Sequence, residues 1–398
     1  MMKKIMILGA SILQLPAIQK AKQMGLQVVA VDMNSEAVGF LEAGVEKEVI
    51  STIDIPAVLA AAKRHKIDGI MTLASDMPMR TVATVAHEMG LIGITEETAV
   101  KTTNKAAMRR ALKDSRVPIP KFFEVSSEEA FWQAVEQMRG PFMIKPADNS
   151  GSRGIIRVDD LEDRTAAIVA YRYSLSNSRC GDVVVEEYMQ GPEVSVETLT
   201  INGECHVIQI TDKLTTGAPY FVEMGHSQPT RLDGETAEKI RQIAIAANRA
   251  VGITNGPSHT EIIITQEGPK IVELGARLGG DCITTHLVPL STGVDMVRCC
   301  ICIALGEKPE LEPTISKGSA IRYFPQTPGT IKAIDGISEA EKIFGVQQVS
   351  FVYGAGETVG KINSSAARMG FVIAQAGDAN GAIKCCEEAM RKIKTTIV

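Results

Sequence analysis

The chain has 398 residues, of which 45% are hydrophobic and 22% are charged, which excludes a disordered, collagen-like or coiled-coil protein. At roughly 150 residues per domain, this length predicts two or three domains, each able to bury its own core. The 47 acidic residues outnumber the 42 lysines and arginines, which argues against nucleic acid as a partner, because proteins that bind its backbone carry strong basic patches.

The N-terminus resembles a signal peptide in having two lysines and a short apolar run. Gly9 and Pro16 interrupt that run and no small-residue cleavage site follows, so residues 5–8 are interpreted as a buried strand. No apolar stretch approaches the roughly 18–20 residues of a membrane span. The eight cysteines form no Cys-x-x-Cys pair, and Cys299, Cys300 and Cys302 fit a buried helix. We therefore expect a cytoplasmic protein with no membrane partner.

The first 95 or so residues alternate strand and helix patterns, which predicts a parallel sheet with right-handed crossovers. Strands are predicted over 5–8, 28–31, 48–50, 69–73 and 91–94, and helices over 16–24 and 55–65. The turn after residue 8 lacks the Gly-x-Gly-x-x-Gly pattern, which disfavours a nicotinamide cofactor. Asp32 and Asp76 each follow a predicted strand, where a carboxylate either faces a ligand or belongs to an ordinary turn.

The pattern changes from about residue 96. A helix is predicted over 98–112, followed by a proline-containing linker at 118–120 and a compact stretch to about 190 with one helix over 127–138. A strand-rich region is expected over 191–275, closed by a helix near 293–305. From residue 318 the chain reads as strands, Gly-Pro turns and a final helix over 380–394.

Lys105 lies within the helical pattern over 98–112. Thr102 or Thr103 can cap a helix that begins next to them, which puts the lysine in the first turn, where it opposes the helix dipole. Arg109, four residues on, adds a like-charge neighbour. A bound anion would relieve this arrangement; a solvated lysine is the alternative.

Lys145 ends a short apolar strand over 142–146, and a loop rich in small residues follows it. The loop residues Ser150, Gly151, Ser152 and Gly154 leave backbone amides free to hold phosphate oxygens. The lysine precedes the glycines, so this is not a Walker A loop. A plain flexible hairpin is the other interpretation.

A second apolar strand, over 183–185, delivers the acidic pair Glu186 and Glu187. Tyr188, Met189 and a Gly-Pro turn follow, and a further carboxylate, Glu193, lies seven residues after Glu186. An extended hinge of this kind can offer backbone groups to an adenine edge, and the later carboxylate can accept hydrogen bonds from ribose hydroxyls.

Two strands that flank residues 265–269 predict a hairpin. With that loop Ile264 pairs with Lys270, and Glu261 lies opposite Glu273 with the Cβ atoms about 5 Å apart. Such a like-charge pair suits Mg²⁺, which commonly takes one or two carboxylates plus substrate phosphates. A one-residue slip in register would remove the argument. Arg277 follows closely enough to reach a phosphate or carboxylate.

The order of these motifs resembles the ATP-grasp superfamily, and the resemblance spans nearly the whole chain. It implies an α/β protein, α+β in the grasp itself, with an N-terminal parallel α/β domain at 1–96. The ATP-grasp domain would span 97–315, with a small lid at about 118–190. A C-terminal α+β domain like that of amino-acid ligases and purine-pathway enzymes would span 316–398.

The resemblance also implies roles for individual residues. Lys105 and Lys145 would bind the ATP phosphates under a mobile loop over 150–154, and Arg277 would be the phosphate or acyl-phosphate arginine. Residues 186–189 would form the adenine hinge, with Glu193 on the ribose. Glu261 and Glu273 would hold Mg²⁺ or Mn²⁺. Many members carry Asn two residues after the second glutamate, but this chain has Gly275, so a second metal would be held more weakly or by water.

The implied activity is that of a carboxylate–amine ligase that consumes ATP and forms an acyl phosphate. His259 would orient a substrate or deprotonate the amine, or it is structural. Gly279 and Arg322 are further substrate candidates, a surface salt bridge being the other interpretation of the arginine. The substrates would be amino acids, with a phosphoribosylamine–glycine ligase of purine biosynthesis as the rival. A bicarbonate-using carboxylase and a non-catalytic nucleotide-binding protein are further alternatives. The family is commonly homodimeric.

Overall fold

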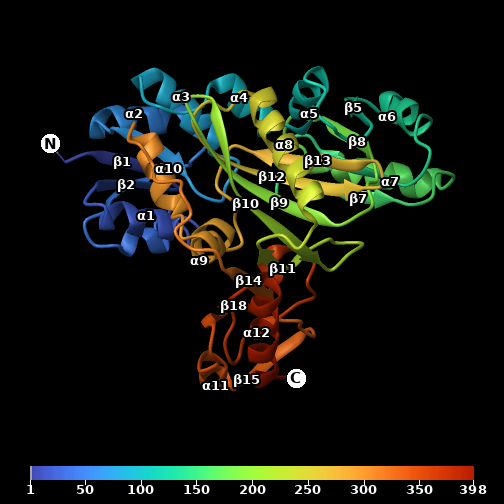
Figure 1. Ribbon diagram of the computed structural model, residues 1–398. Helices are drawn as coiled ribbons and strands as arrows, with labels where there is room; N and C mark the ends of the chain where they lie inside the picture. The colour runs from blue at the N-terminus through green and yellow to red at the C-terminus, as the bar shows by residue number, and fades with distance from the viewer. Residues whose placement is uncertain (1) are drawn as a thin grey trace.

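The computed structural model describes residues 2–398 and contains four β-sheets (Figure 1). The N-terminal sheet is parallel and has the order β3-β2-β1-β4, as the alternating pattern predicted. Its strands are β1 Lys4–Leu8, β2 Gln27–Asp32, β3 Glu46–Val49 and β4 Gly69–Thr72, and its helices are α1 Leu15–Gln23, α2 Ile55–His65 and α3 Met79–Met89, with the 3-10 turn η1 Val38–Leu41. Apolar side chains of β1 and β2 are buried on both faces, which is why their sequences are nearly continuous hydrophobic runs.

Three predictions for the N-terminal half are wrong. Residues 91–94 form no strand; they are an irregular connection between α3 and the next helix. The helix pattern over 98–112 splits into α4 Glu96–Lys101 and α5 Lys105–Asp114. Asn104, rather than either threonine, caps α5: its Oδ1 accepts from the amide of Ala107 at 3.0 Å. The break follows from Asn104 taking an extended conformation to make this cap.

The lid has its own antiparallel sheet, of order β5-β8-β6-β7, at the right of Figure 1. The elements are β5 Phe122–Val125, α6 Glu128–Val135, β6 Phe142–Pro146, β7 Ile156–Val158, α7 Arg164–Ser176 and β8 Val183–Glu187. Phe131, Phe142 and Tyr171 form a separate small core between this sheet and its helices. The sequence predicted α6 but not α7.

The largest sheet is fully antiparallel and has the order β13-β12-β9-β10-β11-β14-β18-β16. The strands are β9 Glu193–Ile201, β10 Glu204–Thr215, β11 Glu223–Gln228, β12 Gly256–Thr265, β13 Gly268–Gly275, β14 Gly318–Tyr323, β16 Val346–Phe351 and β18 Gly370–Ala376. The region over 191–275 is not only strands, because α8 Gly234–Val251 packs on β10 and β13.

A run of short helices connects this sheet to the N-terminal domain. They are the π-helix η2 Ile283–Leu287, α9 Val288–Thr292 and α10 Met296–Ala304, and α10 packs on α1 and β4. Cys299, Cys300 and Cys302 are buried free thiols on α10, which confirms the predicted buried helix. Within residues 2–398 no single helix is long and apolar enough to cross a membrane. By length and composition only, the pair 283–292 and 296–304 meets that test together, bent by 113°.

The C-terminal unit is built on strands that belong to the large sheet. Helix α12 Ala379–Lys392 packs on β14 and β18 (Figure 1). It buries Cys386 and Ala389. The remaining elements are β15 Gly329–Asp335, α11 Ile337–Glu341, β17 Thr358–Val359, the 3-10 turn η3 Ser365–Ala367 and β19 Lys394–Ile397. The three-part architecture is confirmed, while the residue boundaries of the domains stay a prediction.

Candidate active site

A large pocket, of about 730 Å³, lies where the lid, the large sheet, the N-terminal domain and the C-terminal unit meet. Most of the residues that the sequence singled out line it: Lys105, Lys145, Ser150, Gly151, Ser152, Glu186, Glu187, Tyr188, Met189, Glu193, His259, Glu261, Glu273 and Arg277. Gly154, Gly279 and Arg322 are not among the lining residues. Five segments far apart in the sequence therefore converge on one cavity.

Lys145 and Arg109 hold the carboxylate of Glu186 between them. Glu186 is 1% exposed, and its oxygens accept from Arg109 Nε at 2.6 Å, Arg109 Nη2 at 3.1 Å and Lys145 Nζ at 2.8 Å. Burial raises the pKa of Glu186, but Arg109 and Lys145 outweigh it and bring the pKa to about 2. One carboxylate between two cations leaves an excess positive charge at the pocket wall, which favours a bound anion.

The sequence placed Arg109 beside Lys105 as a repulsive neighbour, and that interpretation is wrong. Arg109 is fully buried and donates to the carbonyls of Ile271 and Val272 as well as to Glu186. Its charge is therefore compensated within the fold. Arg109 connects α5 to β8 and β13, a role that the sequence could not show.

Lys105, at the start of α5, is also buried. Its Nζ donates to the carbonyl of Asn149 at 2.7 Å and to Oε1 of Glu273 at 2.9 Å, while its backbone amide donates to Ala147. The lysine is thus partnered, not solvated, and it ties the grasp helix α5 to the loop that follows Lys145.

The small-residue loop connects β6 and β7, as predicted. Gly151, Ser152 and Gly154 all have positive φ, and a Cβ on Gly151 would meet nothing within 4 Å. A Cβ on Gly154 would instead lie 2.5 Å from Asn177 and 2.6 Å from Pro146. Gly154 is therefore needed for close packing at the base of the loop, whereas 150–152 face the pocket.

The hinge segment that follows Glu186 is held by a backbone hydrogen bond, a cation–π contact and an ion pair. The amide of Tyr188 donates to Pro141, and Arg157 stacks over the Tyr188 ring with its Cζ 4.0 Å from the centroid. Glu187 pairs with Lys270 at 2.9 Å, and Met189 is buried. These contacts fix an extended segment along the pocket.

Glu261 and Glu273 are direct cross-strand partners on β12 and β13, as predicted, although the turn is not the predicted one. Ile264 pairs with Pro269 and Ile263 with Lys270, one residue out of the expected register. A β-bulge between Glu261 and Ile262 compensates for this shift and restores the pair. Bulges of this kind re-aim side chains next to functional sites, and here the bulge places both carboxylates at the pocket.

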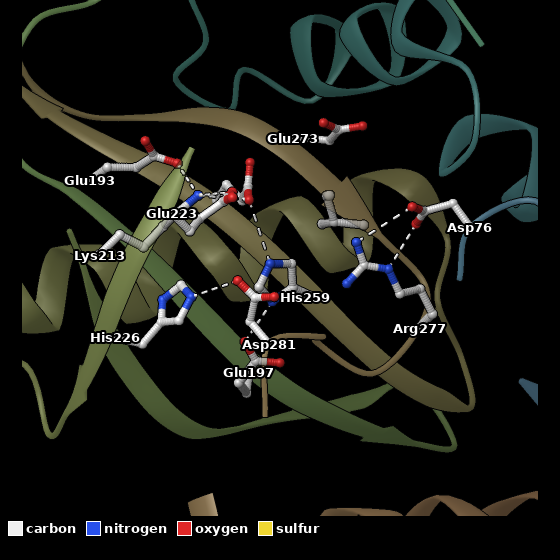
Figure 2. A network of polar contacts seen from close by, with 12 residues as sticks. Asp76, Glu193, Glu197, Lys213, Glu223, His226, His259, Glu273, Arg277 and Asp281 are labelled. Atoms are coloured by element: carbon white, nitrogen blue, oxygen red, sulfur yellow. Dashed lines mark hydrogen bonds and ion pairs between the residues drawn. The ribbon is translucent and has the colours of Figure 1, made fainter. Parts of the chain in front are cut away.

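Lys213, on β10, is a pocket residue that the sequence did not single out. Its Nζ lies 2.5 Å from Glu193, 2.9 Å from Glu261 and 3.7 Å from Glu223, as Figure 2 shows for the labelled side chains. Burial lowers the pKa of Lys213, but these three carboxylates outweigh it and hold the pKa well above its ordinary value. One cation among three carboxylates leaves an uncompensated negative charge, which favours a bound cation.

His259 pairs with Glu197, a buried carboxylate on the neighbouring strand β9. His259 Nδ1 lies 2.6 Å from Glu197 Oε1, and Nε2 lies 3.6 Å from Glu261. The Glu197 Oε2 atom is buried without a hydrogen-bond partner. Burial lowers the pKa of His259, but Glu197 and Glu261 outweigh it and raise the pKa to about 9, so the imidazole is charged at neutral pH. A charged ring cannot take a proton from an amine, which favours the orienting role.

The His259–Glu197 pair predicts a pH-dependent stability. Because the pKa of His259 is raised on folding, the pair stabilises the protein fully below pH 6.5, and this contribution is lost as the pH rises through about 9. The expected loss is on the order of 3 kcal/mol. We expect urea unfolding between pH 6 and 10 to show a steep decline for the wild type and a flatter one for Glu197→Gln. The exposed His87, changed to Gln, should retain the wild-type slope; equal slopes in all three would contradict the assignment.

Arg277 is held by Asp76, which comes from the loop after β4. Its Nε donates to Oδ1 at 2.9 Å, and Nη2 lies 3.5 Å from Oδ2 (Figure 2). Burial lowers the pKa of Arg277, but Asp76 outweighs it and raises the pKa. Asp32, by contrast, accepts only from the backbone amides of Ala10 and Asn34. Of the two strand-end aspartates, one is a pocket residue and the other a turn carboxylate.

Gly279 and Arg322 lie behind the pocket wall. A Cβ on Gly279 would lie 2.8 Å from both Glu197 and His259, so this glycine makes room for that pair. Arg322 is 9% exposed and donates to the carbonyls of His226 and Ile321. The surface salt bridge considered for Arg322 is wrong, because the side chain packs across Gly225 on the neighbouring strand.

Asn363 and Ser365 of the C-terminal unit line the pocket, and Arg368, which the sequence did not identify, pairs with the pocket residue Asp281. Arg368 donates to both oxygens of Asp281 at 2.7 and 2.8 Å, and it stacks over Tyr323. His226 Nε2 lies 3.2 Å from the same carboxylate. Asp281 and Cys282 are consecutive non-glycine residues with positive φ. Such strained conformations persist only where contacts with the surrounding structure hold the backbone in place.

The residues present fit a hard divalent cation that also binds phosphate. Across residues 2–398 there is no group of three or more His, Cys, Asp or Glu side chains arranged around one metal position. Glu261 and Glu273 are two carboxylates on one face, and each pairs with a lysine: Glu261 with Lys213, which it shares with two other carboxylates, and Glu273 with Lys105. Two carboxylates plus substrate oxygens are what Mg²⁺ commonly takes.

Comparison with known proteins agrees with this geometry. Residues 138–285 match the ATP-grasp domain family, and residues 322–398 match the L-amino acid ligase C-terminal domain 2. The chain is 28% identical over 282 residues to the L-arginine-specific L-amino acid ligase of Bacillus subtilis, covering 69% of this chain and 67% of that protein.

Two solved structures share the whole architecture. The L-amino acid ligase from Bacillus licheniformis has a TM-score of 0.85 at 24% identity and covers 100% of this chain and 99% of its own. The phosphoribosylglycinamide synthetase from Anaerococcus prevotii has a TM-score of 0.80 at 21% identity and covers 100% of both chains. By these matches the chain is an L-amino acid ligase-like ATP-grasp enzyme, of the ligase class that forms C–N bonds and releases ADP.

Proposed function

We propose that this protein activates the carboxylate of an amino acid with ATP and joins it to an amine, forming an amide or peptide bond. The observation that carries the proposal is the facing pair Glu261 and Glu273 in the same pocket as Lys105 and Lys145. This set provides cations for a polyphosphate and carboxylates for its metal. The match of residues 322–398 to the L-amino acid ligase C-terminal domain favours amino acids over the sugar amine of a purine-pathway ligase.

In this proposal the charge of each pocket residue decides which part of the substrates it binds. Lys145 and Lys105 bind the phosphates of ATP, and residues 150–152 cover them with backbone amides. Residues 186–189 hold the adenine, and Glu193 accepts from the ribose. Glu261 and Glu273 would hold Mg²⁺, which neutralises phosphate charge. Arg277 binds the substrate carboxylate beside the γ-phosphate.

Catalysis would then rest on positioning and charge neutralisation, as is general for phosphoryl transfer. A carboxylate oxygen of the amino acid attacks the γ-phosphorus, the bond to the bridging oxygen breaks, and ADP leaves. The amine attacks the acyl carbon, phosphate leaves, and the amine loses a proton. The loop over 150–152 excludes water that would hydrolyse the acyl phosphate.

The proposal is tested by amino-acid-dependent release of ADP, with hydroxylamine present to trap an acyl phosphate as a hydroxamate. We expect ADP release with at least one L-amino acid, a matching hydroxamate, and loss of both on chelation of divalent metal. Pairs of amino acids, phosphoribosylamine with glycine, and bicarbonate are compared in parallel. Turnover only with phosphoribosylamine and glycine, or only with bicarbonate, would replace the proposal; nucleotide binding without turnover on any carboxylate would indicate a non-catalytic protein.

A further inference from the structure

Gly275 is the last residue of β13, and the neighbouring Asp76 side chain leaves no room for a larger residue there. It is not among the glycines with positive φ, so its backbone does not require the residue type. A Cβ at this position would lie 2.7 Å from Oδ1 of Asp76, closer than real Cβ atoms approach other atoms. The space that a side chain at 275 would fill is occupied by the Asp76 carboxylate.

Asp76 reaches this position through a loop with an unusual backbone. Ala74 has a φ of +56°, which is rare for a residue with a side chain and costs on the order of 1 kcal/mol or more. The amide of Met79 then donates to the Asp76 carbonyl, so α3 begins directly behind it. The N-terminal domain thus maintains a strained turn that ends with a carboxylate inside the pocket.

The Asp76–Arg277 pair faces the cavity. Each side chain is 17% exposed, and both residues line the pocket together with Glu261 and Glu273. Arg277 uses Nε and Nη2 toward Asp76 and Nη1 toward the carbonyl of Leu278 at 3.3 Å. Three of the five guanidinium N–H groups are then engaged, which leaves two for a substrate oxygen.

A carboxylate next to an arginine fork is complementary to a zwitterion. An α-amino acid carries its ammonium group one carbon away from its carboxylate, so its two charges match Arg277 and Asp76 side by side. A carboxylic acid without that ammonium brings a like charge next to Asp76 and no cation for it. The pair therefore provides both orientation and selection.

We propose, on the basis of the proposed ligase function, that Asp76 is a positioning and specificity residue. It orients Arg277 toward the substrate carboxylate and accepts a hydrogen bond from the α-ammonium group of the amino acid that is activated. Gly275 serves this arrangement by leaving room for the Asp76 carboxylate.

The first test compares the best amino acid substrate with its 2-hydroxy analogue, using hydroxamate formation as the readout. Wild-type turnover of the amino acid is measured first and tests the proposed function by itself. We expect the wild type to prefer the amino acid by about 100-fold in kcat/KM, and Asp76→Asn to reduce that preference at least 10-fold. The Kd for ADP should stay within about twofold, because Asp76 does not contact Lys105 or Lys145. An Asp76→Asn variant that keeps the full preference overturns the proposal.

The second test asks whether Gly275 acts through Asp76. Gly275→Ala should lower kcat/KM about as much as Asp76→Ala does, because the new methyl group displaces the carboxylate. The double variant should be no worse than Asp76→Ala alone, since the methyl group then has no carboxylate to displace. Gly377→Ala is the matched control: this exposed glycine has no neighbour within 4 Å and should behave as the wild type. Additive losses in the double variant would show that Gly275 has another role and would overturn the coupling.

Discussion

Lys145→Ala is expected to reduce amino-acid-dependent ADP release by at least about 10²- to 10³-fold, the usual effect of removing one preorganised charge from a reacting centre. The fold should survive, because Arg109 still holds Glu186 through two hydrogen bonds. What is lost is the excess positive charge at the pocket wall, so the Kd for ATP should rise as well. Steady-state kinetics and calorimetry of nucleotide binding measure the two effects.

Lys121→Ala is the control for this prediction. Lys121 lies on the same lid, but it is exposed and donates only to the carbonyl of Gln137. It should keep wild-type turnover and nucleotide affinity. Comparable losses in both variants would show that general lid stability, not the phosphate contact, is responsible, and unchanged activity in Lys145→Ala would remove its assignment.

Arg109→Met is expected to destabilise the protein by about 3–5 kcal/mol, the range for breaking one partner out of a buried ion pair. The substitution would leave the Glu186 charge with Lys145 alone and would remove the hydrogen bonds to the carbonyls of Ile271 and Val272. Since Glu186 lies on β8 and Ile271 on β13, the loss should loosen the lid from the large sheet. The urea midpoint measures this effect.

The neighbouring residue offers a matched comparison. Arg110 carries the same side chain on the same helix, but it is 56% exposed and pairs with Glu124 at the surface. Arg110→Met should cost less than about 1 kcal/mol, as exposed pairs do. If the two variants lower the urea midpoint equally, the buried Arg109–Glu186 pair does not stabilise the protein more than an exposed pair does.

Local chemistry allowed much of the site to be predicted from the sequence. Lys145 before a small-residue loop, the Glu186–Glu187 pair and the two hairpin glutamates are short-range patterns, and all of them line the pocket. The Glu261–Glu273 pairing shows the limit of such reasoning: the expected partners are correct, but the turn is shifted and a bulge corrects it. Backbone irregularity of that kind depends on the packing of the whole sheet.

Helix α8 was missed although its signals are present in the sequence. Asp233 caps α8 and Gly252 ends it with a φ of +90°, while Ala237, Ile240, Ala244 and Ala247 give a helical apolar stripe. The many apolar residues of the flanking strands concealed that stripe. The buried partners Lys213, Asp76, Glu197 and Arg368 could not be assigned, because each meets its counterpart only through tertiary folding.

The large sheet runs without interruption from β13, which carries Glu273, through β11 and β14 to β16. Residues 318–323 of the C-terminal unit are thus bonded by backbone rungs to the strand that carries Glu223 and His226. Any rotation of that unit must bend the sheet, so it moves together with the pocket floor. The lid shares no strand with this sheet. We therefore expect the lid to open and close over a nucleotide, while the C-terminal unit, joined to the large sheet, stays fixed relative to β11.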